Sequence, residues 1–242
     1  MLSSLGWGAL AASSLVLGAL LAFARSWPSR WVGLVLAFGA GALISSISFE
    51  LALEGVQLGG PGSTAIGTGI GAVTYYVLDG VITRRFSAGR GRPGRSQTSD
   101  AGPALALGAF LDGVPEQVAL GIGLAAEEGA SLGLLVAIFV SNLPEAVGSA
   151  TDMRAAGTSR RKVMWLWLAV ALICMLATVV GYAAADAASG GFKAAIHGFA
   201  AGALIVMLID SMIPEAAKGS GRAAGLVTTL GFAVASAMAM VS

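Results

Sequence analysis

The chain of 242 residues is short of charge, cysteine and histidine. Only 11% of its residues are charged, whereas about 25% are charged in an average soluble domain. The single cysteine, Cys174, excludes an internal disulfide framework and any metal site built from several cysteines. The single histidine is His197. This composition excludes an ordinary soluble domain, and the formal net charge of +1 averages over an uneven distribution along the chain.

The chain is instead rich in apolar and small residues. Hydrophobic residues make up 56% of the sequence, the mean hydropathy is +0.83, and there are 35 glycines. Such a composition is typical of membrane proteins, in which small residues allow helices to approach closely. The first apolar run, from Leu5 to Phe23, shows no signal-peptide cleavage pattern and is long enough to remain as a spanning helix.

Apolar runs of membrane-spanning length recur along the whole chain. A spanning helix needs about 20 mostly apolar residues. The sequence therefore predicts an all-α integral membrane protein that forms a single transmembrane domain of eight helices. The predicted spans are 4–24, 31–52, 65–83, 102–124, 131–153, 163–184, 193–214 and 223–241.

The basic residues give this arrangement an orientation. With eight spans, thirteen of the fourteen lysines and arginines fall on one side of the membrane, and only Lys193 falls on the other. Because positive charge favours the cytoplasmic side, both termini are expected outside a plasma (inner) membrane. The loop 84–101 is rich in Gly, Arg and Ser and is expected to be a flexible cytoplasmic linker. Its arginines favour a lipid-facing anchor over nucleic-acid binding.

Two stretches of the chain resemble each other. The stretch 37-AFGAGALISSISFELALEG-55 is similar to 199-FAAGALIVMLIDSMIPEA-216, and each has a carboxylate seven or eight residues after the shared small-residue pattern. The spans that contain them are expected to cross the membrane in opposite directions. This is typical of transporters built from inverted repeats, here spans 1–3 and 6–8 around spans 4 and 5. Chance similarity between Gly/Ala-rich helices is the alternative.

Spans 4 and 5 are interrupted by nearly the same polar pattern, 109-AFLDGVPEQVALGIG-123 and 138-IFVSNLPEAVGSA-150. An ionised side chain at the membrane centre costs at least about 2.5–3.5 kcal/mol, so such residues face a cavity, a partner or an ion. Asp112 and Glu116 share one helix face, and Ser141 and Glu145 have the same spacing, with Asn142 beside them.

A proline precedes each of the two glutamates. Proline removes a helical hydrogen bond, which frees the carbonyls of Leu111 and Val140. A free carbonyl at membrane depth is tolerated where it lines a cavity or meets a ligand. Each helix therefore offers carboxylate, side-chain and main-chain oxygen, and clusters of oxygen bind cations.

The two patterns are expected to meet near the membrane midplane. At about 1.5 Å rise per residue, Asp112 and Glu145 share one level, and Glu116 and Ser141 share a second level about one turn further out. No basic residue lies in a span core to pair with these acids. Two other interpretations stay open: the prolines only kink the helices, or protonated carboxyls bond to one another.

The same residues resemble a known family. The pattern H-N-x-P-E-G in the fourth and fifth of eight helices marks the ZIP (Zrt/Irt-like protein) metal transporters, and 112-DGVPEQ-117 and 141-SNLPEA-146 are similar to it. The GAGAL of span 2 and the FAAGAL…IPEA of span 7 extend the resemblance. It implies transport of zinc or a similar divalent metal through a binuclear midplane site. The implied site residues are Asp112, Glu116, Ser141, Asn142 and Glu145.

The chain departs from the family pattern at several positions. Asp112 and Ser141 stand where the family has histidine, Gly113 replaces its Asn, and span 6 lacks the acid that some members have. With neither imidazole nor thiolate, the ligands are all oxygen, which favours Mn²⁺, Mg²⁺ or Fe²⁺ over Zn²⁺. The resemblance by itself implies zinc as the substrate.

Other polar residues are candidates for the pathway. Glu50 in the outer part of span 2 is expected at the entrance, and Asp210 in span 7 at the exit. Glu127 and Glu128 form either an acidic mouth that concentrates cations or ordinary solvated loop charge. His197, near the outer end of span 7, is expected to be a packing residue.

Three functions remain open from the sequence. The favoured one is a transporter of divalent cations, which is not an enzyme and has the lipid bilayer and metal ions as its partners. The second is a metal-binding or sensor-like relative that does not transport. The third, an intramembrane aspartyl-type enzyme built on Asp79 and Asp112, lacks the expected GxGD signature. The small-residue helices are also compatible with a homodimer.

Overall fold

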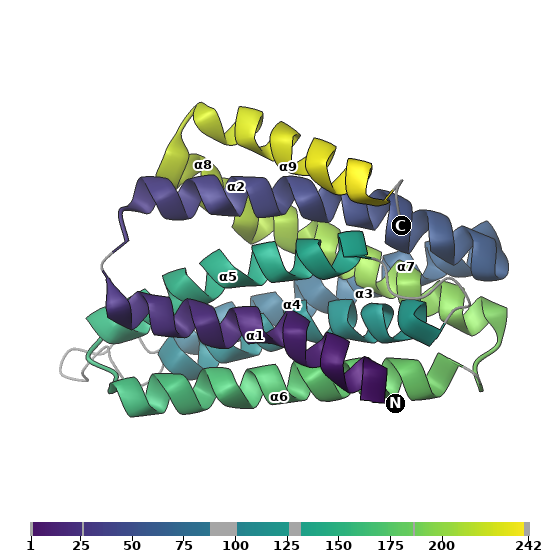
Figure 1. Ribbon diagram of the computed structural model, residues 1–242, viewed down its shortest axis with the longest axis horizontal. Helices are drawn as coiled ribbons and strands as arrows, with labels where there is room; N and C mark the ends of the chain where they lie inside the picture. The colour runs from purple at the N-terminus through teal and green to yellow at the C-terminus, as the bar shows by residue number, and fades with distance from the viewer. Residues whose placement is uncertain (1, 26, 88–100, 126–131, 186, 240–242) are drawn as a thin grey trace.

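A computed structural model describes residues 2–25, 27–87, 101–125, 132–185 and 187–239. Within these ranges the chain is a bundle of helices that run roughly along one axis, with no strand (Figure 1). The helices are α1 (Leu2–Ala24), α2 (Ser29–Ser46), η1 (Ile47–Leu53), α3 (Glu54–Ser87), α4 (Ala101–Ala125), α5 (Leu132–Ala155), α6 (Arg160–Ala185), α7 (Gly190–Met207), η3 (Leu208–Met212), α8 (Ile213–Ser220) and α9 (Ala223–Ala239). The segments η1 and η3 are π-helical.

The helices have the lengths and hydropathy of a membrane protein, which confirms the predicted all-α membrane class. Five helical stretches of the described chain are long and apolar enough to cross a membrane: Leu2–Ala24, Ser29–Val81, Leu132–Ala155, Arg160–Ala185 and Gly190–Ser220. The second is 53 residues long and contains the predicted span 31–52 and most of the predicted span 65–83. Ala223–Ala239 is a shorter apolar helix. The total of eight spans remains a prediction.

The turn between the two spans of that 53-residue stretch lies at Gly60. Gly60 has a φ of 86°, a conformation that a residue with a Cβ rarely adopts, and Pro61 follows it. The helix therefore continues through residues 53–59, beyond the predicted span 31–52. At its other end α3 reaches Ser87, into the predicted loop 84–101, because arginines are good helix formers.

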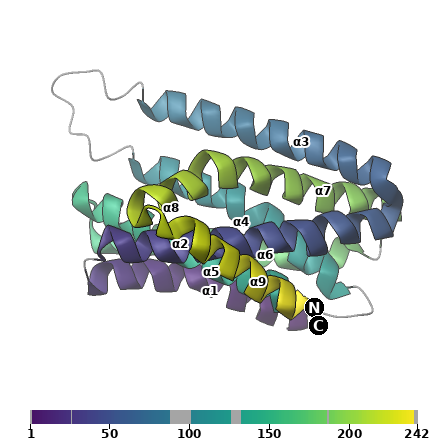
Figure 2. The same ribbon diagram turned by 90° about the horizontal axis from the view of Figure 1, so that it is seen from above.

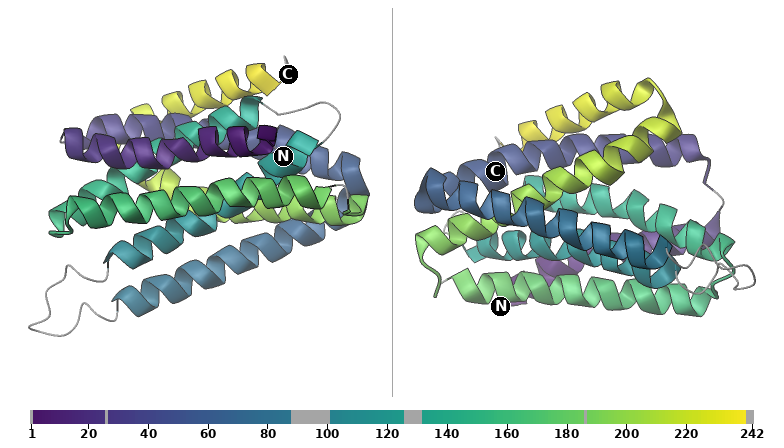
Figure 3. Two further views of the ribbon diagram at one scale, coloured as in Figure 1. Left: turned by 60° about the horizontal axis from the view of Figure 1, so that its bottom comes forward. Right: turned by 180° about the vertical axis from the view of Figure 1, so that it is seen from behind.

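The two ends of the bundle differ in charge. The start of α1 and the end of α9 lie at the same end, which we call the terminal end (Figure 3, left). The opposite, basic end carries the end of α1, the start of α2 and the helix junctions at residues 156–159 and 221–222. There Arg154 donates from Nη1 to the Ala22 carbonyl at 3.1 Å and stacks on Phe23. Lys193 is the one described basic residue at the terminal end. Which end faces the cytoplasm remains a prediction.

Two helix pairs, α2 with α9 and α3 with α7, are held together by glycines (Figure 2). A Cβ on Gly41 or Gly231 would overlap a main-chain carbonyl of the facing helix, and the same is true of Gly71 and Gly202. In a membrane, helices associate by such close packing, because burial from water drives only the insertion.

The contacts of the two pairs repeat each other. Gly41 lies on the Thr228 carbonyl and Gly202 on the Thr68 carbonyl, while Gly231 and Gly71 lie on the carbonyls of Phe38 and Phe199. The α7 positions follow their α2 counterparts by 161 residues, as does the start of η3 relative to η1. Because α2 and α7 run in opposite directions, this is the relation expected of inverted repeats (Figure 1).

Two glycines of α3 provide a matched test of this packing. Gly71→Ala places a methyl group on the Phe199 carbonyl, and we expect it to destabilise the protein by about 1–3 kcal/mol and to lower its melting temperature in detergent. Gly69→Ala, two residues away, meets nothing within 4 Å and should leave the melting temperature unchanged or raise it. Equal melting temperatures for the two variants would contradict the role of the contact.

Candidate metal centre

The interrupted turn of α5 is buried. Ser141 and Asn142 are 2% and 3% exposed, and Glu145 is half-buried. The Ser141 hydroxyl donates to the Ile138 carbonyl at 3.1 Å, and Pro144, which has no N–H, cannot bond the Val140 carbonyl. The turn thus combines an acid, an amide, a hydroxyl and a main-chain oxygen.

Two glycines from other helices lie against this turn. A Cβ on Gly18 of α1 would lie 2.5 Å from the Leu143 carbonyl oxygen. A Cβ on Gly39 of α2 would lie 3.1 Å from the Ser141 Cα and 3.2 Å from the Val140 carbonyl oxygen. The turn is therefore approached closely by helix backbones and, beside Gly39, by the side chain of Met212, whose Cε would lie 2.9 Å from a Cβ at that position. The sequence pattern of small residues pointed to close packing but not to this location.

The interrupted turn of α4 is just as deeply buried. Glu116 and Gln117 are 0% exposed, and Pro115 lies within the helix. Gln117 Oε1 accepts a hydrogen bond from Thr178 Oγ1 in α6, while its Nε2 has no partner among the described residues. Asp112 lies in α4, but its side chain is outside the part that the structure describes. The helix α6 therefore supports the motif, a role that the sequence did not reveal.

A sulfur atom lies against the α4 motif. A Cβ on Gly113 would be 2.7 Å from Cys174 Sγ of α6, and Cys174 is fully buried. Gly113 is the position at which the family pattern has asparagine, so the space of that side chain is occupied here by a thiol. The prediction of an all-oxygen site rested on the motif residues alone, and a lone cysteine 61 residues after Gly113 gave no signal of this contact.

The helices α4 and α5 contact each other and run in opposite directions. The predicted site requires this antiparallel contact, because its residues come from both helices. Among the described side chains, which do not include Asp112, no group of three or more His, Cys, Asp or Glu residues is placed to hold a metal ion. The joint ligation of one ion by Asp112, Glu116, Ser141, Asn142 and Glu145 remains a prediction.

The predicted pathway residues have different environments. Glu50 lies in η1 and is 7% exposed, and its Oε1 is placed against Gly133 at the start of α5. Asp210 is exposed in η3, next to the exposed Ile209, and Asp79 of α3 is near enough to repel it electrostatically. Glu127 and Glu128 lie outside the described residues. His197 is 1% exposed, in the packed face of α7.

Comparison with known proteins gives two findings. A family model described as ZIP zinc transporter matches residues 88–239, which include both interrupted helices. A protein of Arabidopsis thaliana named "Putative zinc transporter At3g08650" is 29% identical over 206 residues, which cover 84% of this chain and 32% of that protein. The chain thus spans about a third of the length of this relative.

The contact between Gly113 and Cys174 can be tested with a double-mutant cycle. Gly113→Ala places a methyl group on the sulfur, and we expect it to cost about 1–3 kcal/mol of stability, measured as a lower melting temperature in detergent. In a Cys174→Ala background, which opens the space, the same change should cost clearly less. Additive effects of the two substitutions would show that the contact is not tight.

Proposed function

The chain belongs to the ZIP family of zinc transporters, and we propose that it carries a divalent metal cation across the membrane through a site between α4 and α5. The observation that carries the proposal is Glu116, a fully buried carboxyl in a proline-interrupted, otherwise apolar helix. Burial of an acid at membrane depth is costly, and a cation offsets that cost. The repeated P-E pattern of α5 supplies an antiparallel counterpart.

We assign the ligands to the two interrupted turns. Asp112, Glu116 and Glu145 supply carboxylates, and Ser141 and Asn142 supply side-chain oxygen. Asn142 is 3% exposed, and its Nδ2 has no partner among the described residues. We assign its Oδ1 to the cation. The Val140 carbonyl, left without its helical donor by Pro144, is an additional oxygen donor at this depth.

Zinc or a related ion is the proposed cargo. The family name and the name of the relative both point to zinc. The oxygen-rich motif residues favour Mn²⁺, Fe²⁺ or Mg²⁺, while the Cys174 sulfur beside Gly113 is a softer donor in the immediate surroundings. The three carboxylates suit any of these divalent ions, so the choice among them is left to a measurement of flux.

The access route follows from the same assignment. We propose that cations enter at the terminal end near Glu50 and the acidic Glu127 and Glu128, and leave past Asp210. This direction assumes that the terminal end lies outside a plasma membrane. Small-residue helix faces are compatible with a homodimer in that membrane.

A second candidate function is a metal-binding relative that does not transport. The observation that favours it is the replacement of both motif histidines by Asp112 and Ser141. Such a protein would bind a divalent cation at the same turns without moving it across the membrane.

Two acid substitutions test the site. Glu116→Ala and Glu145→Ala should each reduce metal uptake into proteoliposomes by at least about tenfold, because each removes a carboxylate from the ion. The matched control is Glu54→Ala, which removes an acid at the first residue of α3, outside the two interrupted turns, and should leave uptake close to wild type. Unchanged uptake in both of the first two variants would disprove the site.

A panel of ions tests the cargo and separates the two functions. Fluxes of Zn²⁺, Mn²⁺, Fe²⁺, Mg²⁺ and Cd²⁺ are measured in proteoliposomes of the wild-type chain, beside equilibrium binding of the same ions in detergent. Saturable flux of one or more of them is the expected result. Saturable binding without flux of any ion would favour the non-transporting relative.

A further inference from the structure

Two arginines share one aromatic ring at the basic end of the bundle. The Cζ of Arg154, near the end of α5, lies 5.8 Å from the centre of the Phe23 ring, and that of Arg160, at the start of α6, lies 5.7 Å from it. Phe23 lies near the end of α1, which packs against both of the other helices (Figure 1). Three helix ends therefore bring two positive charges onto one ring, and each is attracted to its π-electrons.

Most of the donors of these two arginines remain available. Arg154 Nη1 donates to the carbonyl of Ala22, one of the last carbonyls of α1, at 3.1 Å. A guanidinium carries five N–H donors, so this bond leaves the others of Arg154 unused. Among the described residues Arg154 and Arg160 form no further hydrogen bond and no ion pair. Both side chains are exposed, so a ligand can reach their donors from outside the protein.

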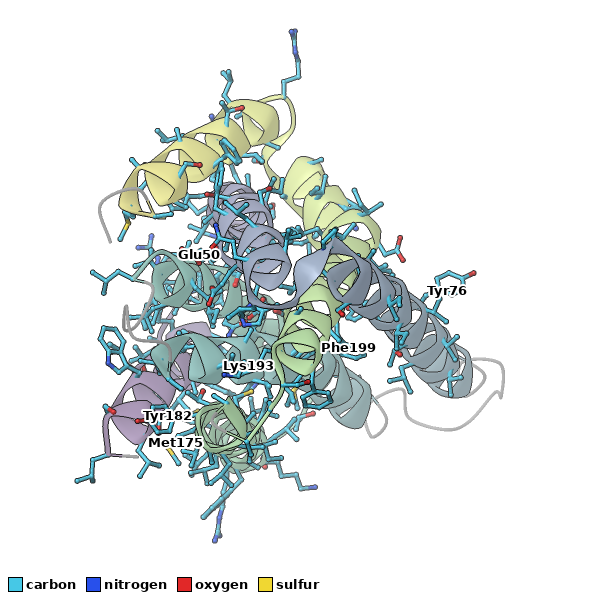
Figure 4. The ribbon with its side chains drawn as sticks, turned by 90° about the vertical axis from the view of Figure 1, so that its right-hand side faces the viewer. Glu50, Tyr76, Met175, Tyr182, Lys193 and Phe199 are labelled. Atoms are coloured by element: carbon cyan, nitrogen blue, oxygen red, sulfur yellow. The ribbon has the colours of Figure 1, made fainter. Side chains whose placement is uncertain are left out.

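The two charges lack an acid to offset them among the described side chains, which do not include Asp152. Arg161 and Lys162 follow Arg160 in the first turn of α6, and that turn contains no acid. Positive charges close together repel each other, and the dipole at the start of a helix also disfavours them. The terminal end is different, with Lys193 as its one described lysine or arginine (Figure 4). An anion at the arginine pair would therefore be stabilising.

Tryptophans mark the level of the membrane surface at this end. Trp27, Trp31 and Trp165 are all exposed, between α1 and α2 and in the first two turns of α2 and α6. Tryptophan is enriched at the headgroup level of membranes because its ring is apolar and its N–H is polar. Trp27 Nε1 donates to the Leu21 carbonyl at 3.0 Å, which ties the segment after α1 to that helix. The arginine pair therefore lies at the level of lipid headgroups.

An exposed apolar stripe runs along α6 from this level toward the membrane interior. Trp165, Leu168, Leu172 and Leu176 are exposed and follow one another at helical spacing, on the face that begins with Arg161. An acyl chain can lie along such a stripe while its headgroup stays at the basic end. This arrangement favours a lipid over a free anion as the ligand.

We propose that Arg154 and Arg160, organised by Phe23, form a binding site for the phosphate of an anionic phospholipid. Guanidinium groups present paired N–H donors that match phosphate oxygens, and such charge-assisted bonds are about twice as strong as neutral ones. The bound headgroup joins the ends of α1, α5 and α6 by neutralising the charges that meet there. The site goes beyond the proposed function and does not depend on which ion is transported.

Retention of lipid by the purified chain tests the site. The full chain is titrated in detergent with phosphatidylglycerol or phosphatidylcholine of the same acyl chains, and retained lipid is measured by native mass spectrometry. We expect phosphatidylglycerol to bind saturably and more tightly than phosphatidylcholine. Arg154→Gln combined with Arg160→Gln should weaken phosphatidylglycerol binding by about tenfold or more and leave phosphatidylcholine unchanged. Equal retention of the two lipids by the wild-type chain would overturn the proposal.

A second double variant controls for the overall charge of this end. Arg30→Gln combined with Arg222→Gln removes the same charge from two exposed arginines, at the start of α2 and between α8 and α9. Binding of phosphatidylglycerol to this variant should stay close to wild type. Equal losses in the two double variants would show a diffuse effect of charge and overturn the site. If the Arg154 substitution unfolds the protein, Arg160→Gln alone decides, since Arg160 has no hydrogen bond among the described residues.

Two further measurements test the organisation of the site and the identity of its ligand. Phe23→Leu keeps both charges but removes the ring that holds them, and it should weaken phosphatidylglycerol binding by about two- to fivefold. Unchanged affinity in this variant would contradict the role of the ring. Inorganic phosphate should not displace the lipid at equal concentration, and displacement would show that the site takes a free anion and overturn the assignment to a lipid.

Discussion

The fold depends on one kind of contact, in which a glycine of one helix lies against a main-chain carbonyl of another. Within a membrane the lipid is as apolar as the side chains, so close backbone approach replaces hydrophobic burial as the force that holds helices together. Gly41 with Thr228 and Gly202 with Thr68 make this contact in two helix pairs. A Cβ at these positions would overlap the facing carbonyl, which explains why glycine is required there.

The same constraint shapes the candidate metal centre. Gly18 and Gly39 bring two helices onto the interrupted turn of α5, and Gly113 admits the Cys174 sulfur beside the turn of α4. These glycines let helix backbones, and the sulfur-containing side chains of Met212 and Cys174, come close to the two interrupted turns. The motif is thereby buried, and a cation stabilises a buried acid more strongly than it would in water.

The inverted relation between the two halves links the centre to the terminal end. The π-helical segments η1 and η3 begin 161 residues apart. The same separation relates Gly41 of α2, which packs on α9, to Gly202 of α7, which packs on α3. The halves differ in what these segments carry: Glu50 in η1 is buried and approaches α5, whereas Asp210 in η3 is exposed. The two halves of a symmetric scaffold thus place their acids in different environments.

The sequence by itself determined the membrane class, the approximate helix ranges, the grouping of basic residues and the two interrupted helices, because hydropathy and proline act locally. It also pointed to the internal repeat, since small-residue patterns survive in both halves. Only the tertiary structure brought Cys174 to Gly113, Glu50 to Gly133 and Gly39 to Ser141. It also buried His197 in the packed face of α7. These neighbours belong to different helices, and the face that each helix turns to the others is decided by packing of the whole bundle, which local periodicity does not encode.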